Sequence, residues 1–95
     1  MRVTTDELRA AANALLQHLD DTGYGVVDLD ADYYWSVAPD QRYNVYEEPV
    51  DLSVGQLSDD LAEVRAIGTG EKEPIGYGLV WLSSVLRAVG ERTVR

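Results

Sequence analysis

The sequence predicts an α+β domain, with one N-terminal helix, a strand or β-hairpin, and two helices packed on the strand's apolar face. Two patterns support this prediction. Apolar and polar residues alternate from Val27 to Val37, a period of two that is typical of a half-buried strand. Apolar residues recur every three or four positions before and after that stretch, as they do in amphipathic helices. Because 95 residues suffice for one core, we expect a single compact domain over residues 1–95.

The N-terminal helix is predicted from signals at both of its ends. Thr4 followed by Glu7 forms a capping box, in which each side chain accepts a hydrogen bond from the other residue's backbone amide. Gly23 suits the left-handed turn that ends a helix. Between these positions lies an apolar stripe made of Leu8, Ala12, Leu15 and Leu19.

The alternating stretch assigns its side chains to two faces of a strand. The core-facing side is predicted to carry Val27, Leu29, Ala31, Tyr33, Trp35 and Val37. The solvent-facing side is predicted to carry Asp28, Asp30, Asp32, Tyr34 and Ser36. Residues 38–41 are predicted to form a type I turn with Pro39 at its second position. The run Arg42–Glu47 then returns as a second strand, and the alternative is an ordered loop that continues to Pro49.

A second helix is predicted from residue 53. Ser53 with Gln56 has the spacing of another capping box. The apolar stripe that follows contains Leu57 and Leu61, and Gly68 is predicted to end the helix.

The last helix is the most apolar element of the chain. Pro74 is predicted to begin it, because a missing amide proton does no harm in a first turn, and Gly90 to end it. One helix cannot easily bury both flanks of so wide a stripe in a domain of this size. We therefore expect the Tyr77–Trp81–Val85 edge to be partly covered and to be a self-association surface.

Composition excludes several classes of protein. The chain has no cysteine, so it has no disulfide framework and no thiolate metal site. We expect no signal peptide, no membrane span and a cytoplasmic location. The formal net charge is −9, and residues 20–63 hold twelve acidic residues against one basic residue, Arg42. Direct binding of nucleic acid is therefore not expected, since phosphates would be repelled.

No motif predicts a metal site, a cofactor or catalysis. The spacing Asp28-x-Asp30-x-Asp32 matches the start of a calcium loop, but the sixth position is Tyr33 and the twelfth is Pro39, where glycine and glutamate are required. The glycine pairs lack either phosphate-binding fingerprint. A row of exposed aspartates does not provide the cleft that raises a catalytic pKa. We therefore expect no metal, no cofactor and no enzymatic activity.

Aromatic residues are concentrated in the acidic segment, which contains six of the eight. Tyrosine and tryptophan dominate interface hot spots, and carboxylates steer a basic partner to its site. The sequence predicts a small acidic protein that binds a basic protein, such as an immunity or antitoxin-type inhibitor of a nuclease-like toxin. The predicted partner surface consists of Asp28, Asp30, Asp32, Tyr34, Tyr46, Glu47, Glu48, Asp59 and Asp60. Two alternatives stay open: an acidic face kept only for solubility, and a structural or regulatory subunit that homodimerises through its C-terminal helix.

Three stretches carry a resemblance to known sequences. They are Asp32-Tyr33-Tyr34-Trp35, the run from Asp51 to Asp60, and the run from Leu79 to Gly90. Together they resemble a widespread group of small, acidic, uncharacterised bacterial proteins. That resemblance implies one compact domain and brings no established activity.

Overall fold

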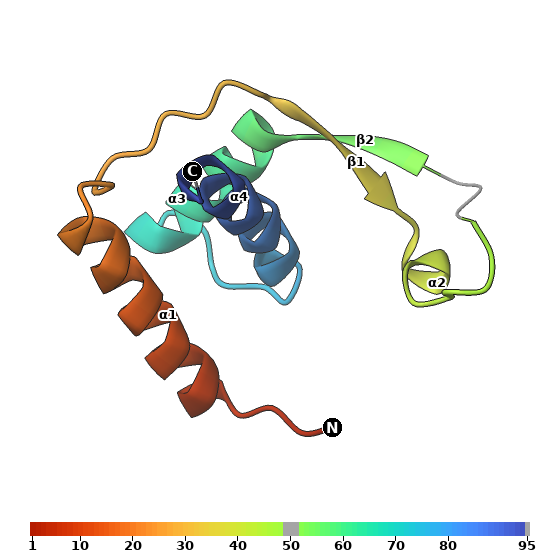
Figure 1. Ribbon diagram of the computed structural model, residues 1–95, viewed down its shortest axis with the longest axis horizontal. Helices are drawn as coiled ribbons and strands as arrows, with labels where there is room; N and C mark the ends of the chain where they lie inside the picture. The colour runs from red at the N-terminus through yellow and green to blue at the C-terminus, as the bar shows by residue number, and fades with distance from the viewer. Residues whose placement is uncertain (49–51, 95) are drawn as a thin grey trace.

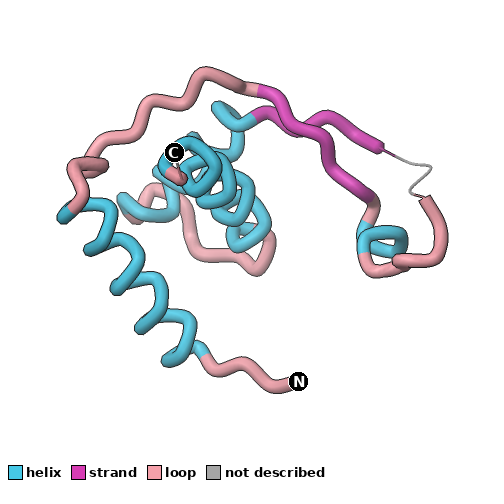
Figure 2. Tube along the Cα trace, viewed as in Figure 1, coloured by secondary structure: helices cyan, strands magenta, loops and turns pink. Residues whose placement is uncertain are grey.

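The computed structural model describes residues 1–48 and 52–94 of the chain. Its elements follow in the order α1 (Thr5–Asp21), β1 (Tyr33–Val37), α2 (Pro39–Arg42), β2 (Leu52–Gln56), α3 (Leu57–Thr69) and α4 (Gly78–Thr93). The two strands form an antiparallel hairpin, and α3 and α4 pack against each other beside it (Figures 1 and 2). The predicted α+β class and the order of helix, hairpin and two helices are confirmed.

Helix α1 begins and ends as its local signals predict. The Thr4 hydroxyl accepts the Glu7 amide at 3.1 Å, and the Glu7 carboxylate accepts the Thr4 amide at 2.9 Å. Gly23 follows the helix with φ of +89°. No residue of α1 is buried, and its central Leu15 is 65% exposed. The helix extends away from α3 and α4 on the side opposite the hairpin (Figure 1), and most of its apolar stripe is exposed.

The alternating stretch becomes a strand only in its second half. Residues 22–32, which we call the linker, run from α1 across the α3–α4 pair to β1 without regular structure (Figure 1). The second strand is Leu52–Gln56 and not Arg42–Glu47, so that prediction is wrong. This register places Val54 opposite Trp35 and Leu52 opposite Val37, apolar pairs that the more polar run 42–47 does not supply.

The segment between the strands differs from the predicted turn. Pro39 opens the short helix α2, because its fixed φ suits the first position of a helical turn. Residues 43–48, which we call the tip loop, follow α2 at the far end of the hairpin (Figure 1). The tip loop agrees with the loop alternative, although the predicted end of that loop at Pro49 lies outside the described residues.

The two faces of the hairpin are reversed relative to the prediction. Residues opposite each other in an antiparallel pair share a face, so Tyr33, Trp35 and their partners form the apolar face. That face is exposed: Trp35 is 71% and Tyr33 is 65% accessible. The helices meet the other face, on which Tyr34 lies beside Gly55. The cause is Gly55, which has no side chain and lets the ring of Tyr34 cross it toward α3.

Helices α3 and α4 form the centre of the molecule. Leu57 and Asp60 of α3 and Gly78 of α4 are the buried residues among those described. A Cβ on Gly78 would lie 2.9 Å from Cδ1 of Ile67, so this glycine permits the close approach of the two helices.

The ends of both helices differ from the predicted ones. Helix α3 passes Gly68 and ends at Thr69, and the Gly70 that follows has a φ of +82°. Helix α4 begins at Gly78 instead of Pro74 and continues through Gly90 to Thr93. The predicted capping box of Ser53 and Gln56 does not form, because Ser53 pairs with Ser36 in the hairpin.

Replacing Gly55 with alanine tests the contact that orients the hairpin. The new Cβ would lie 2.1 Å from Cζ of Tyr34, so the ring must leave its place and its hydrogen bond to α3. We expect Gly55→Ala to lower the free energy of unfolding by about 1–3 kcal/mol in urea denaturation. The matched control is Gly68→Ala, which meets no atom within 4 Å and should be neutral or slightly stabilising. Equal effects at both positions would contradict this account.

Candidate protein-binding surface

Asp32 caps helix α3 from outside the helix. One carboxylate oxygen accepts the Ser58 amide at 2.7 Å, and the other accepts the Gln56 side-chain amide at 2.9 Å and the Ser58 hydroxyl at 3.1 Å. The Asp32 carbonyl oxygen also accepts the Leu57 amide at 2.6 Å. The bonds from Gln56 and Ser58 lower the pKa of the Asp32 carboxyl below its ordinary value. Asp32 therefore stabilises the junction of hairpin and helix, in place of the predicted Ser53 cap.

Tyr34, Asp60 and Ser84 form a polar cluster between three elements. The Tyr34 hydroxyl donates to Oδ2 of Asp60 at 2.5 Å, and the Ser84 hydroxyl donates to the same oxygen at 2.6 Å. Asp60 is only 9% exposed, so these two donors supply the hydrogen bonds that water would otherwise give its side chain. The bond to Asp60 and partial burial raise the pKa of the Tyr34 phenol. The cluster joins β1 to α3 and α4.

Three of the nine predicted partner residues therefore make contacts within the fold. Tyr34 and Asp60 bond to each other in a part-buried contact, so their predicted place on an outward face is wrong. Asp32 is half-exposed and uses its carboxylate to cap α3. Sequence reasoning missed the two residues that explain this arrangement, Gly55 and Ser84. A glycine inside an alternating strand pattern was the available signal for a close approach, whereas nothing local marks Ser84.

The other six predicted residues are exposed but lie on separate parts of the chain. Asp28 and Asp30 belong to the linker, and Asp59 lies on the first turn of α3. The remaining three belong to the tip loop: Tyr46, Glu47 and Glu48. Figure 1 shows the linker and the tip loop at different ends of the molecule, so the structure does not bring these residues into one patch.

The tip loop combines the two features expected of a surface for a basic partner. Tyr43, Val45 and Tyr46 are exposed, Tyr46 to 93%, and Glu47 and Glu48 follow them directly. The loop has internal order, since the Asn44 side-chain oxygen accepts the Tyr46 amide at 3.1 Å. Its base is fixed where the Arg42 guanidinium donates to the Val37 carbonyl at 2.9 Å. Large apolar side chains and carboxylates therefore stand together in solvent on a positioned loop.

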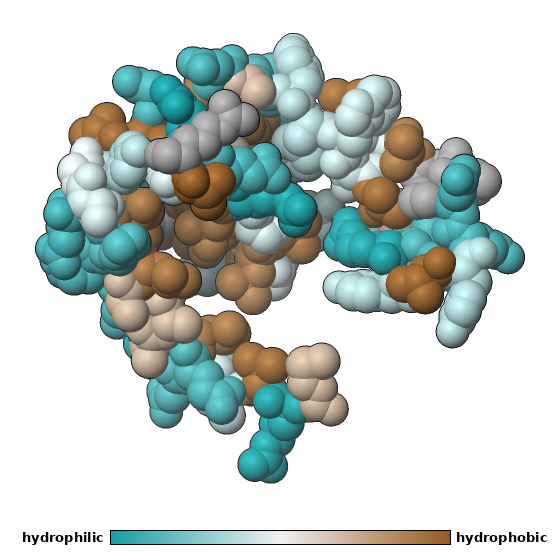
Figure 3. Space-filling view, in the orientation of Figure 1, coloured by the Kyte–Doolittle hydropathy of each residue, from teal (hydrophilic) through white to brown (hydrophobic). Residues whose placement is uncertain are grey.

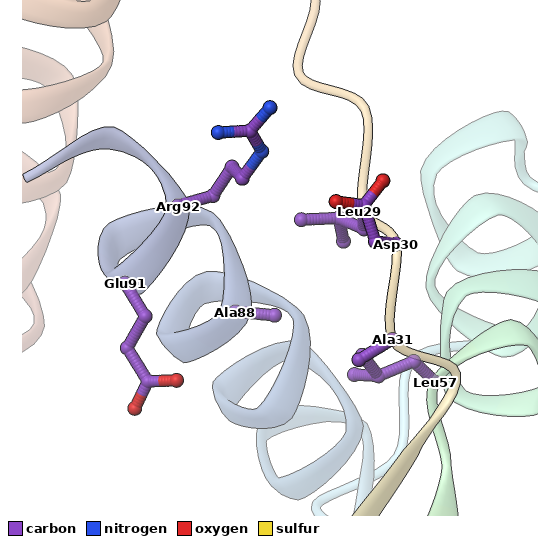
Figure 4. A pocket seen from close by; sticks show the side chains of 7 residues that line it. All are labelled: Leu29, Asp30, Ala31, Leu57, Ala88, Glu91 and Arg92. Carbon is purple, nitrogen blue, oxygen red and sulfur yellow. The ribbon is translucent and has the colours of Figure 1, made fainter. Parts of the chain in front are cut away.

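A hollow lies between the linker and the helix pair (Figure 4). One part, of about 310 Å³, is bounded by Leu29 and Ala31 of the linker, Leu57, and Ala88 and Arg92 of α4. An adjoining part of about 210 Å³ is also bounded by Leu29, Ala31 and Leu57, and it extends to Val85 of α4. Arg92 donates to the Asp28 carbonyl at 3.3 Å and so holds the linker over the hollow. Asp30 and Glu91 also line the larger part, so charged and apolar side chains share its walls, whereas the walls of the smaller part are mostly apolar.

The predicted self-association edge of α4 is partly covered, as expected. Tyr77 is exposed, while Trp81 and Val85 are half-buried. The Tyr77 ring meets the Trp81 ring edge-on at 5.4 Å, and the Lys72 ammonium lies 4.7 Å from the Trp81 ring. Lys72 also pairs with the carboxylate of Glu63. Self-association through this edge stays a prediction.

No family model, curated protein or solved structure matches this chain. The resemblance to small acidic bacterial proteins therefore stays a prediction. Among the described residues, no cluster of three or more histidine and acidic side chains is placed to hold a metal ion. Within those same ranges, no helix has the length and hydropathy needed to cross a membrane.

The lowered pKa of Asp32 predicts how acid affects stability. A carboxyl whose pKa falls on folding adds stability above its ordinary value of 3.8, and this is lost as pH falls through the folded-state pKa. Asp32→Asn should therefore show a shallower loss of stability below about pH 4 in urea titrations. Asp30→Asn removes the same charge from the exposed linker and is the control. If wild type and Asp32→Asn lose stability equally as the pH falls below about 4, Asp32 does not have this role.

The raised pKa of Tyr34 predicts how stability changes at alkaline pH. A phenol whose pKa rises on folding adds stability below its ordinary value of 10.0, and this is lost as pH rises through the folded-state pKa. Tyr34→Phe should cost about 1–2 kcal/mol at pH 7 by removing a donor from Asp60. Tyr34→Phe should also make the free energy of unfolding fall less steeply above pH 10. The control, Tyr46→Phe, should change neither the stability at pH 7 nor this slope. Thermal unfolding between pH 7 and 11 measures both effects, and an unchanged alkaline slope in Tyr34→Phe would contradict them.

Proposed function

We propose that this chain is an acidic protein-binding module that captures a basic protein through its tip loop. The observation that carries the proposal is the exposure of Tyr43, Val45 and Tyr46 beside Glu47 and Glu48 at the far end of the hairpin. Exposed aromatic side chains on a positioned loop are characteristic of interface hot spots, because they bury much area at little entropic cost.

The charge distribution supports a basic partner. The chain carries −9 overall, and twelve of its seventeen acidic residues lie within residues 20–63, which include the tip loop. A field of this sign accelerates encounters with cationic surfaces and repels nucleic acid and acidic proteins. We favour one specific function of this kind: the chain inhibits a basic toxin, as immunity and antitoxin proteins do.

The position of the tip loop also supports binding. The base of the hairpin is fixed to α3 and α4 by Asp32 and Tyr34, whereas the tip loop lies away from both helices (Figure 1). A partner therefore reaches these side chains without displacing the contacts that hold the fold.

Charge reversal in the tip loop tests the proposal. In Glu47→Lys/Glu48→Lys, two charges change from −1 to +1, so the net charge rises from −9 to −5. Glu71→Lys/Glu73→Lys makes the same change in the α3–α4 loop and is the matched control. Each variant is immobilised and exposed to a lysate of cells that naturally produce the protein, and captured basic proteins are purified for binding measurements at 50 and 300 mM salt.

We expect the tip-loop variant to bind the captured protein at least about tenfold more weakly at 50 mM salt and with a flatter salt dependence. The control variant should lose much less, because its charges act only at long range. Tyr46→Ala should raise the dissociation rate and leave the salt dependence as in wild type. Equal binding by both double variants would refute the tip loop as the binding site.

A further inference from the structure

The chain exposes far more surface than a compact protein of its size. Its accessible area is 8047 Å² at 10.5 kDa, whereas a compact monomer of that mass exposes about 5,400 Å². Its radius of gyration is 15.0 Å, against about 12 Å for a compact chain of this length. The excess, about 2,600 Å², is comparable to what a chain buries in an obligate assembly.

Two exposed apolar surfaces contribute to this excess. The first is the stripe on α1, in which Leu8 and Leu15 are exposed. The second is the apolar face of the hairpin, formed by Tyr33, Trp35, Val37, Leu52, Val54 and Gln56. An amphipathic helix gains most of its stability from packing of its apolar face, and a two-stranded hairpin needs a cover for its own.

The two surfaces match each other in size and chemistry. From Leu8 to Leu19 the stripe is about 17 Å long at 1.5 Å per residue. The five-residue strands of the hairpin also span about 17 Å. Neither surface carries a charged side chain, so contact between them desolvates no ion. A helix laid on one face of a hairpin is the layer arrangement that α+β domains commonly use.

We infer that two copies of this chain associate by exchanging arms, so that α1 of each copy covers the apolar hairpin face of the other. Within one chain, α1 and the hairpin lie on opposite sides of the α3–α4 pair (Figure 1). The bond from Arg92 to Asp28 and the Asp32 cap hold the second half of the linker on the helix pair, between α1 and the hairpin. A second copy presents both complementary surfaces at once, and a two-fold axis closes the contact after two chains.

The space-filling view agrees with such an arrangement. Figure 3 shows α1 and the hairpin as separate arms, with apolar residues at the surface over the helices between them. Leu79 and Leu86 of α4 are among the exposed apolar residues. An arm from a second copy would therefore meet apolar surface along its path.

Sedimentation of the wild-type chain is the first test. We expect a species of twice 10.5 kDa at 20–100 µM, and we expect its dissociation constant to fall as salt rises from 50 to 500 mM. The reason is that each chain carries −9, and salt screens repulsion between two like-charged copies. A monomer throughout this range overturns the inference.

Disulfide trapping then identifies the surfaces in contact, since the chain has no cysteine of its own. Leu15→Cys lies on the stripe, Gln17→Cys lies on the opposite side of α1, and Val54→Cys lies on the apolar hairpin face. The Leu15→Cys and Val54→Cys chains are mixed under mild oxidation. The yield of covalent dimer should be at least fivefold higher than from a mixture of Gln17→Cys and Val54→Cys. Only a contact between chains produces this band.

Two other results would overturn the arm exchange. Equal yields from the two mixtures would show that the stripe does not meet the hairpin. An intrachain disulfide as the main product of the double variant Leu15→Cys/Val54→Cys would show that α1 covers its own hairpin. The inference is independent of the basic partner, because dimerisation strengthens with salt whereas capture through the tip loop weakens.

Discussion

The bonds that Asp32 and Tyr34 make with the helices are the constraint on which the rest of the structure depends. These two residues lie two positions apart, at the start of β1, yet they reach Ser58 and Asp60 of α3 and, through Asp60, Ser84 of α4. Carboxylate acceptors make these bonds stronger than bonds between neutral groups. They hold the base of the hairpin to the helix pair. The apolar face of the hairpin consequently points to solvent.

The parts of the fold that were predictable from the sequence are those governed by neighbouring residues. The capping box of Thr4 and Glu7 and the left-handed Gly23 need only local chain to form, and both are present. Alternation correctly indicated a strand that includes Trp35. The apolar stripes likewise indicated helices around Leu61 and Leu82. In each case the residues that determine the conformation lie within one or two turns of each other.

The rest depends on contacts between distant residues, which no local pattern specifies. The cap of α3 comes from Asp32, 26 positions before Ser58, whereas the nearer Ser53 pairs with Ser36 in the hairpin. The direction in which the strand faces was also decided at a distance. Gly55 leaves room for one ring, and Asp60 offers that ring a buried acceptor. Both effects override the preference of Trp35 for burial, because an unpaired buried carboxylate would cost more than an exposed aromatic side chain. The same contacts explain why the predicted acidic surface is divided.

Once the apolar face of the hairpin points outward, charge and hydrophobicity act on different parts of the molecule. The carboxylates of the tip loop act at long range and weaken as salt rises. The uncharged α1 stripe and hairpin face act only on contact, and in the inferred dimer repulsion between like-charged chains would oppose association until salt screens it. Ionic strength would therefore shift the chain between basic-partner capture and self-association. Since the tip loop lies beyond the end of the hairpin face (Figure 1), a dimer built by arm exchange would still present two tip loops. Two linked sites raise the avidity for a partner that presents two cationic surfaces, without any new contact.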